Sequence, residues 1–201
     1  MTKSSNRGCR ITDREEILLL VTGSCYIGDK VKVIWEMSAR IFAGQREMLT
    51  MAGFLPGTDD YAVRIGESFA KQGFMDTLAA QLIRVEPGCV EIGFPFSRHL
   101  TQQHGFVHAG ALAAVVDTAG GFAALSLFDA GDGVLTVEFK INLLAPADGE
   151  RFVARGQVIR TGRTMTVTKG EVVAIKDGRE TVCAVMQQTM MRITGRANVI
   201  G

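Results

Sequence analysis

The segment from His104 to Phe128 contains the clearest set of groups that could do chemistry. It is an apolar run long enough for a helix, and its one carboxylate is Asp117. Removing a carboxylate from water is costly unless the charge is hydrogen-bonded, paired or used. Residues 105–110 lead into the expected helix start, where free backbone N–H groups and the helix dipole stabilise negative charge. Together these groups favour acyl transfer or hydrolysis.

The spacing between the helix start and the carboxylate predicts an assembly of two chains. In a helix, Asp117 lies about 12 Å along the axis from Ala109, at roughly 1.5 Å per residue. One substrate carbonyl cannot contact both the N–H groups at the helix start and the Asp117 carboxylate of the same helix. If both groups act, the carboxylate must come from a second subunit whose helix packs antiparallel. The sequence therefore predicts a homodimer, or a dimer of dimers, with composite sites.

Four polar residues near this helix each allow a structural and a chemical interpretation. His108 directly precedes the helix, where its ring could cap the loop or act as an acid or base near neutral pH. Gln102 and Gln103 could hold a water or a substrate carbonyl, or could simply be exposed. Thr136 could donate its hydroxyl to the site or could point outward from its strand.

Two arginines are candidate phosphate ligands, whereas the sequence gives no sign of a metal site or of three common catalytic motifs. Arg160 and Arg163 flank a tight turn, where guanidinium groups could bind phosphate or remain solvated. The three histidines do not have metal-ligand spacing with any carboxylate pair, so we expect no metal site and no cofactor. The sequence contains no GxSxG elbow, Walker loop or GxGxxG motif.

Composition limits the class of protein and its partners. The 201 residues suffice for one domain with an appendage, and the net charge of +1 gives no general attraction to nucleic acid or membrane. The four cysteines are scattered without a CxxC pair, which favours a reducing cytoplasm. The apolar run could be read as a membrane span, but Asp117 at its centre and the strand patterns after it favour a buried helix.

We expect three regions along the chain. Residues 1–50 show no sustained period and are predicted to be a poorly ordered extension outside the core, and an upstream start choice would explain them. Residues 51–191 are predicted to form the domain. Residues 192–201 are predicted to be a frayed tail.

Within the domain, periodicity predicts two short helices, two strands, one long helix and four more strands. Their expected ranges are 65–71, 74–80, 82–85, 90–96, 109–128, 135–143, 151–160, 163–175 and 180–191. In the first strand after the long helix, Leu135 to Leu143 alternate, which predicts that the odd-numbered residues share one face and that Thr136, Glu138, Lys140 and Asn142 share the other. A helix that is apolar on nearly all sides must be covered on nearly all sides. We therefore predict an α+β domain in which a curved antiparallel sheet wraps around one central helix.

The motif residues resemble those of a known family. The run from Gln102 to Gly110, six further residues and then Asp117-Thr118-Ala119 resembles the pattern N-x-x-G-x-x-H-G-G, six residues, D-x-A. That pattern is typical of hotdog-fold acyl-CoA thioesterases of the phenylacetate-pathway (PaaI) type. The resemblance extends over about residues 65–191. It implies a hotdog fold and hydrolysis of acyl-CoA to a free acid and coenzyme A.

The resemblance also implies roles for individual residues. Asp117 matches the catalytic carboxylate, acting as nucleophile or general base, and the N–H of Ala109 matches the oxyanion donor, beside Gly110 at the substrate-binding helix end. His108 matches the motif histidine. The remaining matches are Gln102 in place of an asparagine, Thr136 in place of a water-orienting serine, and Arg160 and Arg163 as ligands of the coenzyme A phosphates.

Two other activities remain as alternatives. A 3-hydroxyacyl-thioester dehydratase or hydratase would use a histidine ahead of the acidic residue, and His104 lies thirteen residues before Asp117. A sensor that binds acyl-CoA without hydrolysing it would need no catalytic base. Such a protein normally carries a DNA-binding helix pair, which residues 1–50 do not clearly show.

Overall fold

The computed structural model describes residues 53–196 and residue 199. The predicted extension over residues 1–50 lies outside these residues and stays a prediction. The described elements follow one another in the order predicted from periodicity. They are α3 (Tyr61–Phe69), α4 (Gly73–Thr77), β1 (Gln81–Glu86), β2 (Cys89–Pro95), the 3-10 turn η1 (Arg98–Leu100), α5 (Ala109–Leu125), β3 (Gly133–Leu143), β4 (Arg151–Thr161), β5 (Met165–Lys176) and β6 (Arg179–Ile193).

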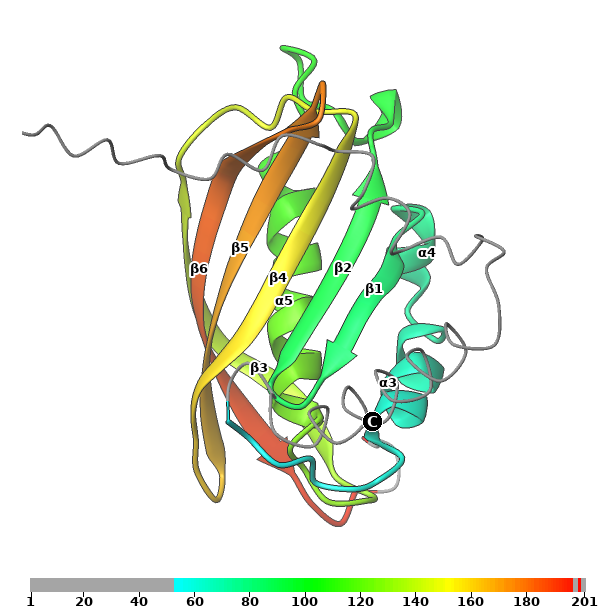
Figure 1. Ribbon diagram of the computed structural model, residues 1–201, viewed down its shortest axis with the longest axis vertical. Helices are drawn as coiled ribbons and strands as arrows, with labels where there is room; N and C mark the ends of the chain where they lie inside the picture. The colour runs from blue at the N-terminus through cyan, green and yellow to red at the C-terminus, as the bar shows by residue number, and fades with distance from the viewer. Residues whose placement is uncertain (1–52, 197–198, 200–201) are drawn as a thin grey trace, which may run out of the picture. The chain divides into compact units, whose positions relative to one another are not determined.

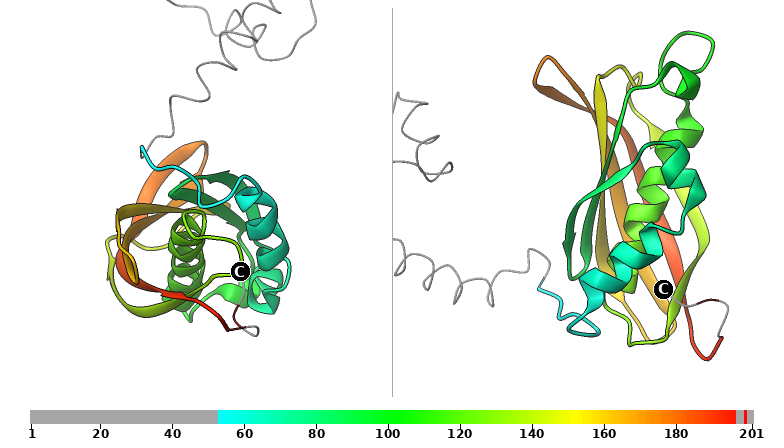
Figure 2. Two further views of the ribbon diagram at one scale, coloured as in Figure 1. Left: turned by 90° about the horizontal axis from the view of Figure 1, so that it is seen from below. Right: turned by 90° about the vertical axis from the view of Figure 1, so that its right-hand side faces the viewer.

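One antiparallel sheet of six strands, in the order β1-β2-β4-β5-β6-β3, curves around α5 (Figures 1 and 2). The expected α+β class and the central helix are confirmed. Strand β3 follows α5 in sequence but pairs with the last strand, so β1 and β3 form the two edges of the sheet. The helix α3 lies against β1 and α5 at the opposite side of the domain from β3.

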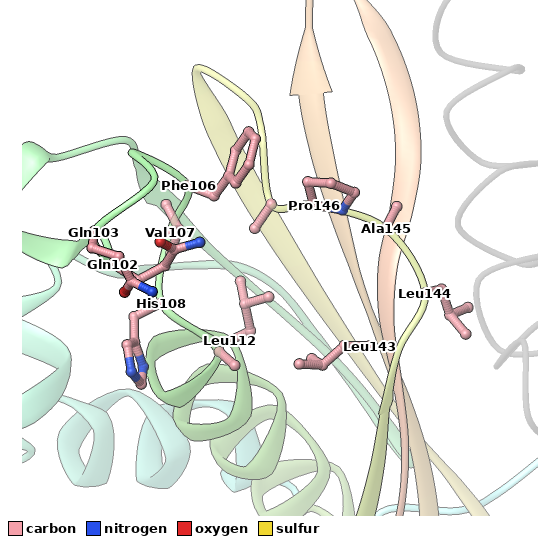
Figure 3. A pocket seen from close by; sticks show the side chains of 12 residues that line it. Gln102, Gln103, Phe106, Val107, His108, Leu112, Leu143, Leu144, Ala145 and Pro146 are labelled. Carbon is pink, nitrogen blue, oxygen red and sulfur yellow. The ribbon is translucent and has the colours of Figure 1, made fainter.

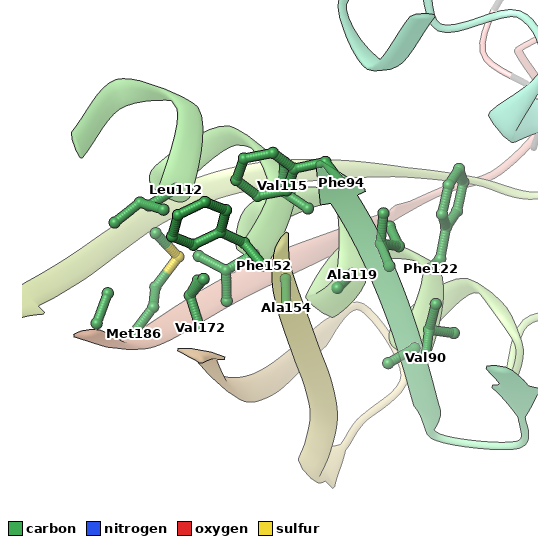
Figure 4. Close-up of a cluster of buried hydrophobic side chains, with 14 of the residues drawn as sticks. Val90, Phe94, Leu112, Val115, Ala119, Phe122, Phe152, Ala154, Val172 and Met186 are labelled. Carbon is green, nitrogen blue, oxygen red and sulfur yellow. The ribbon is translucent and has the colours of Figure 1, made fainter. Parts of the chain in front are cut away.

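The core is the contact between α5 and the inner face of the sheet (Figure 4). Val115, Val116 and Ala119 of the helix are fully buried against it. The sheet contributes Phe152 and Val172, both also without exposed area. Burial of this apolar surface is the main favourable term in the stability of such a domain.

One stripe of α5 is left partly uncovered by residues 53–196. Gly110 is exposed, and the next turns present Ala113, Ala114, Asp117 and Thr118, all half-buried. Their spacing of three and four residues places them along one side of the helix. Asp117, the only carboxylate of α5, lies on this stripe.

A bulge in β3 corrects one detail of the predicted sheet. Thr136 lies opposite Met190 and Phe139 lies opposite Gln188, with a register shift that leaves Val137 as the extra residue. Opposite residues share a face, so Thr136 and Phe139 both face α5. The prediction that they lie on different faces is wrong, because one extra residue reverses the alternation.

The C-terminal strand is also longer than predicted. β6 continues to Ile193, two residues beyond the expected end at Met191. Arg192 pairs with Asp129 and Asp132 in the segment after α5, and its guanidinium lies 5.2 Å from the ring centre of Phe128. These contacts keep the end of the strand attached to the C-terminal end of the helix.

No helix within the described part of the chain is long and apolar enough to cross a membrane.

The contact between α5 and β4 depends on Gly156. A Cβ atom at this position would lie 2.4 Å from the carbonyl carbon of Ala119 and from the nitrogen of Gly120. Both are helix backbone atoms, which cannot move without shifting α5. We predict that Gly156→Ala lowers the free energy of unfolding by about 1–3 kcal/mol, because overpacking forces backbone shifts.

Urea denaturation measures this change, and Gly66→Ala is the matched control. Gly66 lies in α3 and a Cβ there meets no atom within 4 Å. The control variant should be as stable as the wild type or up to about 1 kcal/mol more stable, since alanine is the better helix former. Equal stability of the Gly156→Ala variant and the wild type would contradict the packing described here.

Candidate active site

The first turn of α5 presents one free donor. The ring Nδ1 of His108 accepts the N–H of Gly110 at 2.8 Å, and the N–H of Ala111 bonds to the carbonyl of His108 at 3.0 Å. Among residues 53–196, no acceptor bonds to the N–H of Ala109. A free N–H at a helix start is a donor for a developing oxyanion.

The loop before α5 is held by backbone hydrogen bonds. His108 N–H donates to Leu100 O at 2.8 Å, and Val107 N–H donates to Ala147 O at 3.1 Å. These bonds connect the helix start to η1 on one side and to the loop after β3 on the other. The donor at Ala109 is therefore fixed in position by two neighbouring segments.

A cavity of about 520 Å³ adjoins this helix start (Figure 3). Ala109 lines it, together with the polar side chains of His108, Gln102 and Gln103. The other walls are apolar and come from the loop, the helix and the end of β3. They include Phe106, Val107, Leu112, Leu143, Leu144 and Pro146.

The two glutamines lie in the turn at the edge of the cavity. The side-chain oxygen of Gln102 accepts the N–H of His104, while Gln102 N–H donates to Phe106 O at 2.9 Å. The amide nitrogen of Gln103 lies 3.2 Å from Nε2 of His104. The oxygen of Gln102 is thus used inside the turn, and its amide nitrogen is the group left to face a ligand.

Asp117 is half-buried in the third turn of α5 and is held through one oxygen. Its Oδ1 accepts two hydrogen bonds of 2.9 Å, from Oγ1 of Thr136 and from Nε2 of Gln188. In the described part of the chain, Oδ2 has no hydrogen-bond partner. The carboxylate is fixed by the protein and keeps one oxygen available for chemistry.

Asp117 does not line the cavity at the start of its own helix. The structure therefore keeps the carboxylate and the Ala109 N–H apart within one chain, as the helical spacing requires. Thr136 reaches the carboxylate because the bulge turns it toward α5. Gln188 was not identified from the sequence, although a polar residue between Met186 and Met190 in a strand of alternating burial was a signal for it.

Arg160 and Arg163 lie away from this cavity. Both are exposed and flank the turn between β4 and β5. The loop beside the cavity meets the opposite end of the same strands, where Arg151 pairs with Ile175. The arginines are therefore roughly 30 Å away, the length of ten residues of strand at about 3.3 Å each. Within one chain, the structure does not bring them to the site.

The described cysteines do not offer a competing nucleophile. Cys183 is fully buried and its Sγ bonds to Val172 O at 3.2 Å, and burial raises the pKa of its thiol. Burial also raises the pKa of Cys89. A raised pKa reduces the thiolate fraction at neutral pH. Between residues 53 and 196, no cluster of three or more His, Cys, Asp or Glu side chains could hold a metal ion.

Comparison with known proteins identifies the family of this chain. The model of the thioesterase superfamily matches residues 104–181. A thioesterase family protein from Silicibacter pomeroyi is 48% identical, with a TM-score of 0.67, over 67% of this chain and 99% of that chain. The "putative esterase" SSO2140 of Saccharolobus solfataricus is 36% identical over 47% of this chain and 66% of that protein.

The fold is that of a hotdog protein. The PaaI protein of the E. coli phenylacetic acid degradation operon shares this fold, with a TM-score of 0.62 at 18% identity, over 69% of this chain and 97% of that chain. The chain belongs to the thioesterase superfamily. The resemblance seen in the motif residues and the expected hotdog fold are therefore confirmed.

The contact between the His108 ring and Gly110 leads to a prediction about stability. Removing an N-cap acceptor costs about 1 kcal/mol. We predict this loss of unfolding free energy for His108→Ala, and a value within about half a kcal/mol of the wild type for His108→Asn, because the asparagine oxygen is a strong cap. Urea denaturation of the three proteins measures both changes. A His108→Ala variant as stable as the wild type would show that the ring does not act as a cap.

Proposed function

We propose that this protein hydrolyses acyl-CoA thioesters to a free acid and coenzyme A, at sites formed by two copies of the chain. The N–H of Ala109 from one copy would bind the thioester oxygen, and Asp117 of the other copy would supply the base or nucleophile. The observation that carries the proposal is the state of Asp117. Its carboxylate is fixed through Oδ1, its Oδ2 has no hydrogen-bond partner among residues 53–196, and it lies on the half-buried stripe of α5.

The proposed chemistry uses each of these groups once. The free Oδ2 of Asp117 removes a proton from a water that attacks the thioester carbon, or it attacks that carbon directly to form an anhydride that water then cleaves. The carbonyl oxygen becomes negative and is stabilised by Ala109 N–H and the helix dipole. The C–S bond then breaks, and the coenzyme A thiolate takes up a proton as it leaves.

The uncovered stripe of α5 supports an antiparallel pair of helices. For Ala109 of one helix to lie opposite Asp117 of the other, the two-fold axis must pass near their midpoint, residue 113. Ala113 and Ala114 are half-buried there, and their short side chains allow two helix axes to approach to about 8–10 Å. The short side chains of Ala113 and Ala114 therefore allow the close helix crossing that a site shared by two chains requires.

The free edge of the sheet supports the same dimer. Strand β3 is an edge strand whose apolar residues Val137, Phe139 and Leu143 are each about half exposed. Edge strands with exposed apolar side chains readily pair with another chain. Pairing β3 with its copy would extend the sheet and cover these apolar side chains, and we propose that the acyl group lies along the apolar seam between the paired helices.

A two-fold axis at this position also gives Arg160 and Arg163 a possible role in the substrate site. It reverses one sheet relative to the other, so the end that carries the turn between β4 and β5 comes beside the start of the other copy's α5. We propose that these two arginines bind coenzyme A phosphates in that arrangement.

The dehydratase alternative finds less support. His104 is exposed in the turn with Gln103 and is not among the residues that line the cavity. A histidine that abstracts a proton must lie within hydrogen-bonding reach of the substrate. Hydration of crotonyl-CoA is the measurement that would identify this activity.

Asp117→Asn tests the proposed hydrolysis. The amide keeps the size of the side chain but is neither a base nor a carboxylate nucleophile. We predict that thiol release from a panel of short, long and aromatic acyl-CoAs falls by a factor of about 10² to 10⁴, while the melting temperature changes little. Free thiol is measured with a chromogenic disulfide.

The control is Asp76→Asn, which changes an exposed carboxylate in α4 and should hydrolyse the same substrates at the wild-type rate. Equal rates for Asp117→Asn and the wild type would remove Asp117 from the reaction. Tight acyl-CoA binding by the wild type with no thiol release would instead identify a sensor.

A further inference from the structure

Gln188 is a polar side chain in the centre of an apolar surface. It has 1% of its area exposed and lies on the helix-facing side of β6, between Met186 and Met190. A buried amide is costly unless each of its polar groups is hydrogen-bonded. Its partners therefore indicate why a glutamine occupies this position.

The hydrogen bonds of Gln188 connect the sheet to the carboxylate. Its Oε1 accepts the hydroxyl of Thr168 at 3.0 Å, and Thr168 is itself fully buried on β5. Its Nε2 donates to Oδ1 of Asp117 at 2.9 Å and to the main-chain oxygen of Asp117 at 3.2 Å. Both N–H groups of the amide are thus directed at one residue.

The carboxylate fixes the orientation of this amide. Turning the amide by 180° would place its oxygen against Oδ1 of Asp117, where two acceptors repel. The observed orientation puts the nitrogen beside the carboxylate, in a charge-assisted hydrogen bond that is stronger than one between neutral groups. Thr168 then holds the amide oxygen from the other side.

Helix α5 has a glycine, Gly120, at the position closest to the side-chain amide of Gln188. A Cβ atom at Gly120 would lie 2.1 Å from Oε1 of Gln188 and 2.9 Å from Oγ1 of Thr168. Glycine inside a helix is less stable than alanine. The helix carries the residue type that leaves room for the buried amide.

We propose that Gln188 is a positioning residue for hydrolysis: with Thr168 behind it, it holds Oδ1 of Asp117 so that Oδ2 points to the substrate. Thr136 supplies the second bond to Oδ1, from the edge strand β3. The two donors come from different strands, so they restrict rotation of the carboxylate about its Cβ–Cγ bond. This inference rests on the proposed function, because it requires Asp117 to act on the thioester.

The test compares Gln188→Met with Gln187→Met. Methionine keeps the length of the side chain, suits the neighbouring Met186 and Met190, and removes both N–H donors. We expect kcat for acyl-CoA hydrolysis to fall by about tenfold to a hundredfold, as for a misplaced catalytic group, with KM within about twofold. Gln187 is exposed on the other face of β6, and its variant should match the wild type.

A double-mutant cycle with Asp117→Asn separates positioning from structural support. If Gln188 acts through Asp117, adding Gln188→Met to Asp117→Asn leaves the residual rate unchanged, because there is no carboxylate left to orient. A structural role would lower the rate by the same factor in both backgrounds. That equal loss, or a wild-type kcat for Gln188→Met, would overturn the inference.

A second variant tests the positioning role if Gln188→Met is unstable. If Gln188→Met does not fold, Thr168→Val replaces the hydroxyl behind the amide with a methyl group. The melting temperature should fall because the buried Oε1 of Gln188 loses its donor, and kcat should fall several-fold with KM within about twofold. A wild-type kcat in that variant would also overturn the inference. If Asp117→Asn is fully active, the proposed function itself fails, whereas an inactive Asp117→Asn beside a fully active Gln188→Met overturns the positioning role alone.

Discussion

The position of α5 inside its own curved sheet determines which groups are buried and which face solvent. The sheet curves closely enough to cover the apolar sides of the helix, and the glycines at 156 and 170 allow this approach because a Cβ there would meet helix atoms at 2.3–2.4 Å. Residues 53–196 do not cover the whole helix. The side that stays open carries Asp117, so a carboxylate that would be costly in the core lies at the surface of the chain.

Some hydrogen-bonding groups around the helix are used within the fold, and others are left for a substrate. The ring of His108 caps the helix by accepting the N–H of Gly110. Within the described residues, the N–H of Ala109 is then the free donor of the first turn. Thr136 and Gln188 use Oδ1 of Asp117 and leave Oδ2. At both ends of the site, one atom is fixed by the fold and its neighbour stays free to meet a substrate.

Local periodicity was sufficient to predict the order of helices and strands and the central helix. It failed in β3 because the bulge at Val137 depends on pairing with β6, which lies about fifty residues later in the sequence. Gln188 was missed for the same reason, since its importance comes from cross-strand register and from Gly120. Arg160 and Arg163 were chosen by residue type as ligands of the coenzyme A phosphates, and the strand direction places them at the end of the sheet away from the cavity of their own chain.

Mixed dimers can show whether each site combines Ala109 of one chain with Asp117 of another. Ala109→Pro removes the N–H, and proline suits the first position of a helix, while His108 already has the extended backbone (φ −64°, ψ 137°) found before proline. We predict that Ala109→Pro and Asp117→Asn homodimers are inactive. The purified heterodimer of the two variants should recover about half the wild-type rate, because symmetry leaves one of its two sites intact. A heterodimer as inactive as its parents would show that the two groups do not meet across chains.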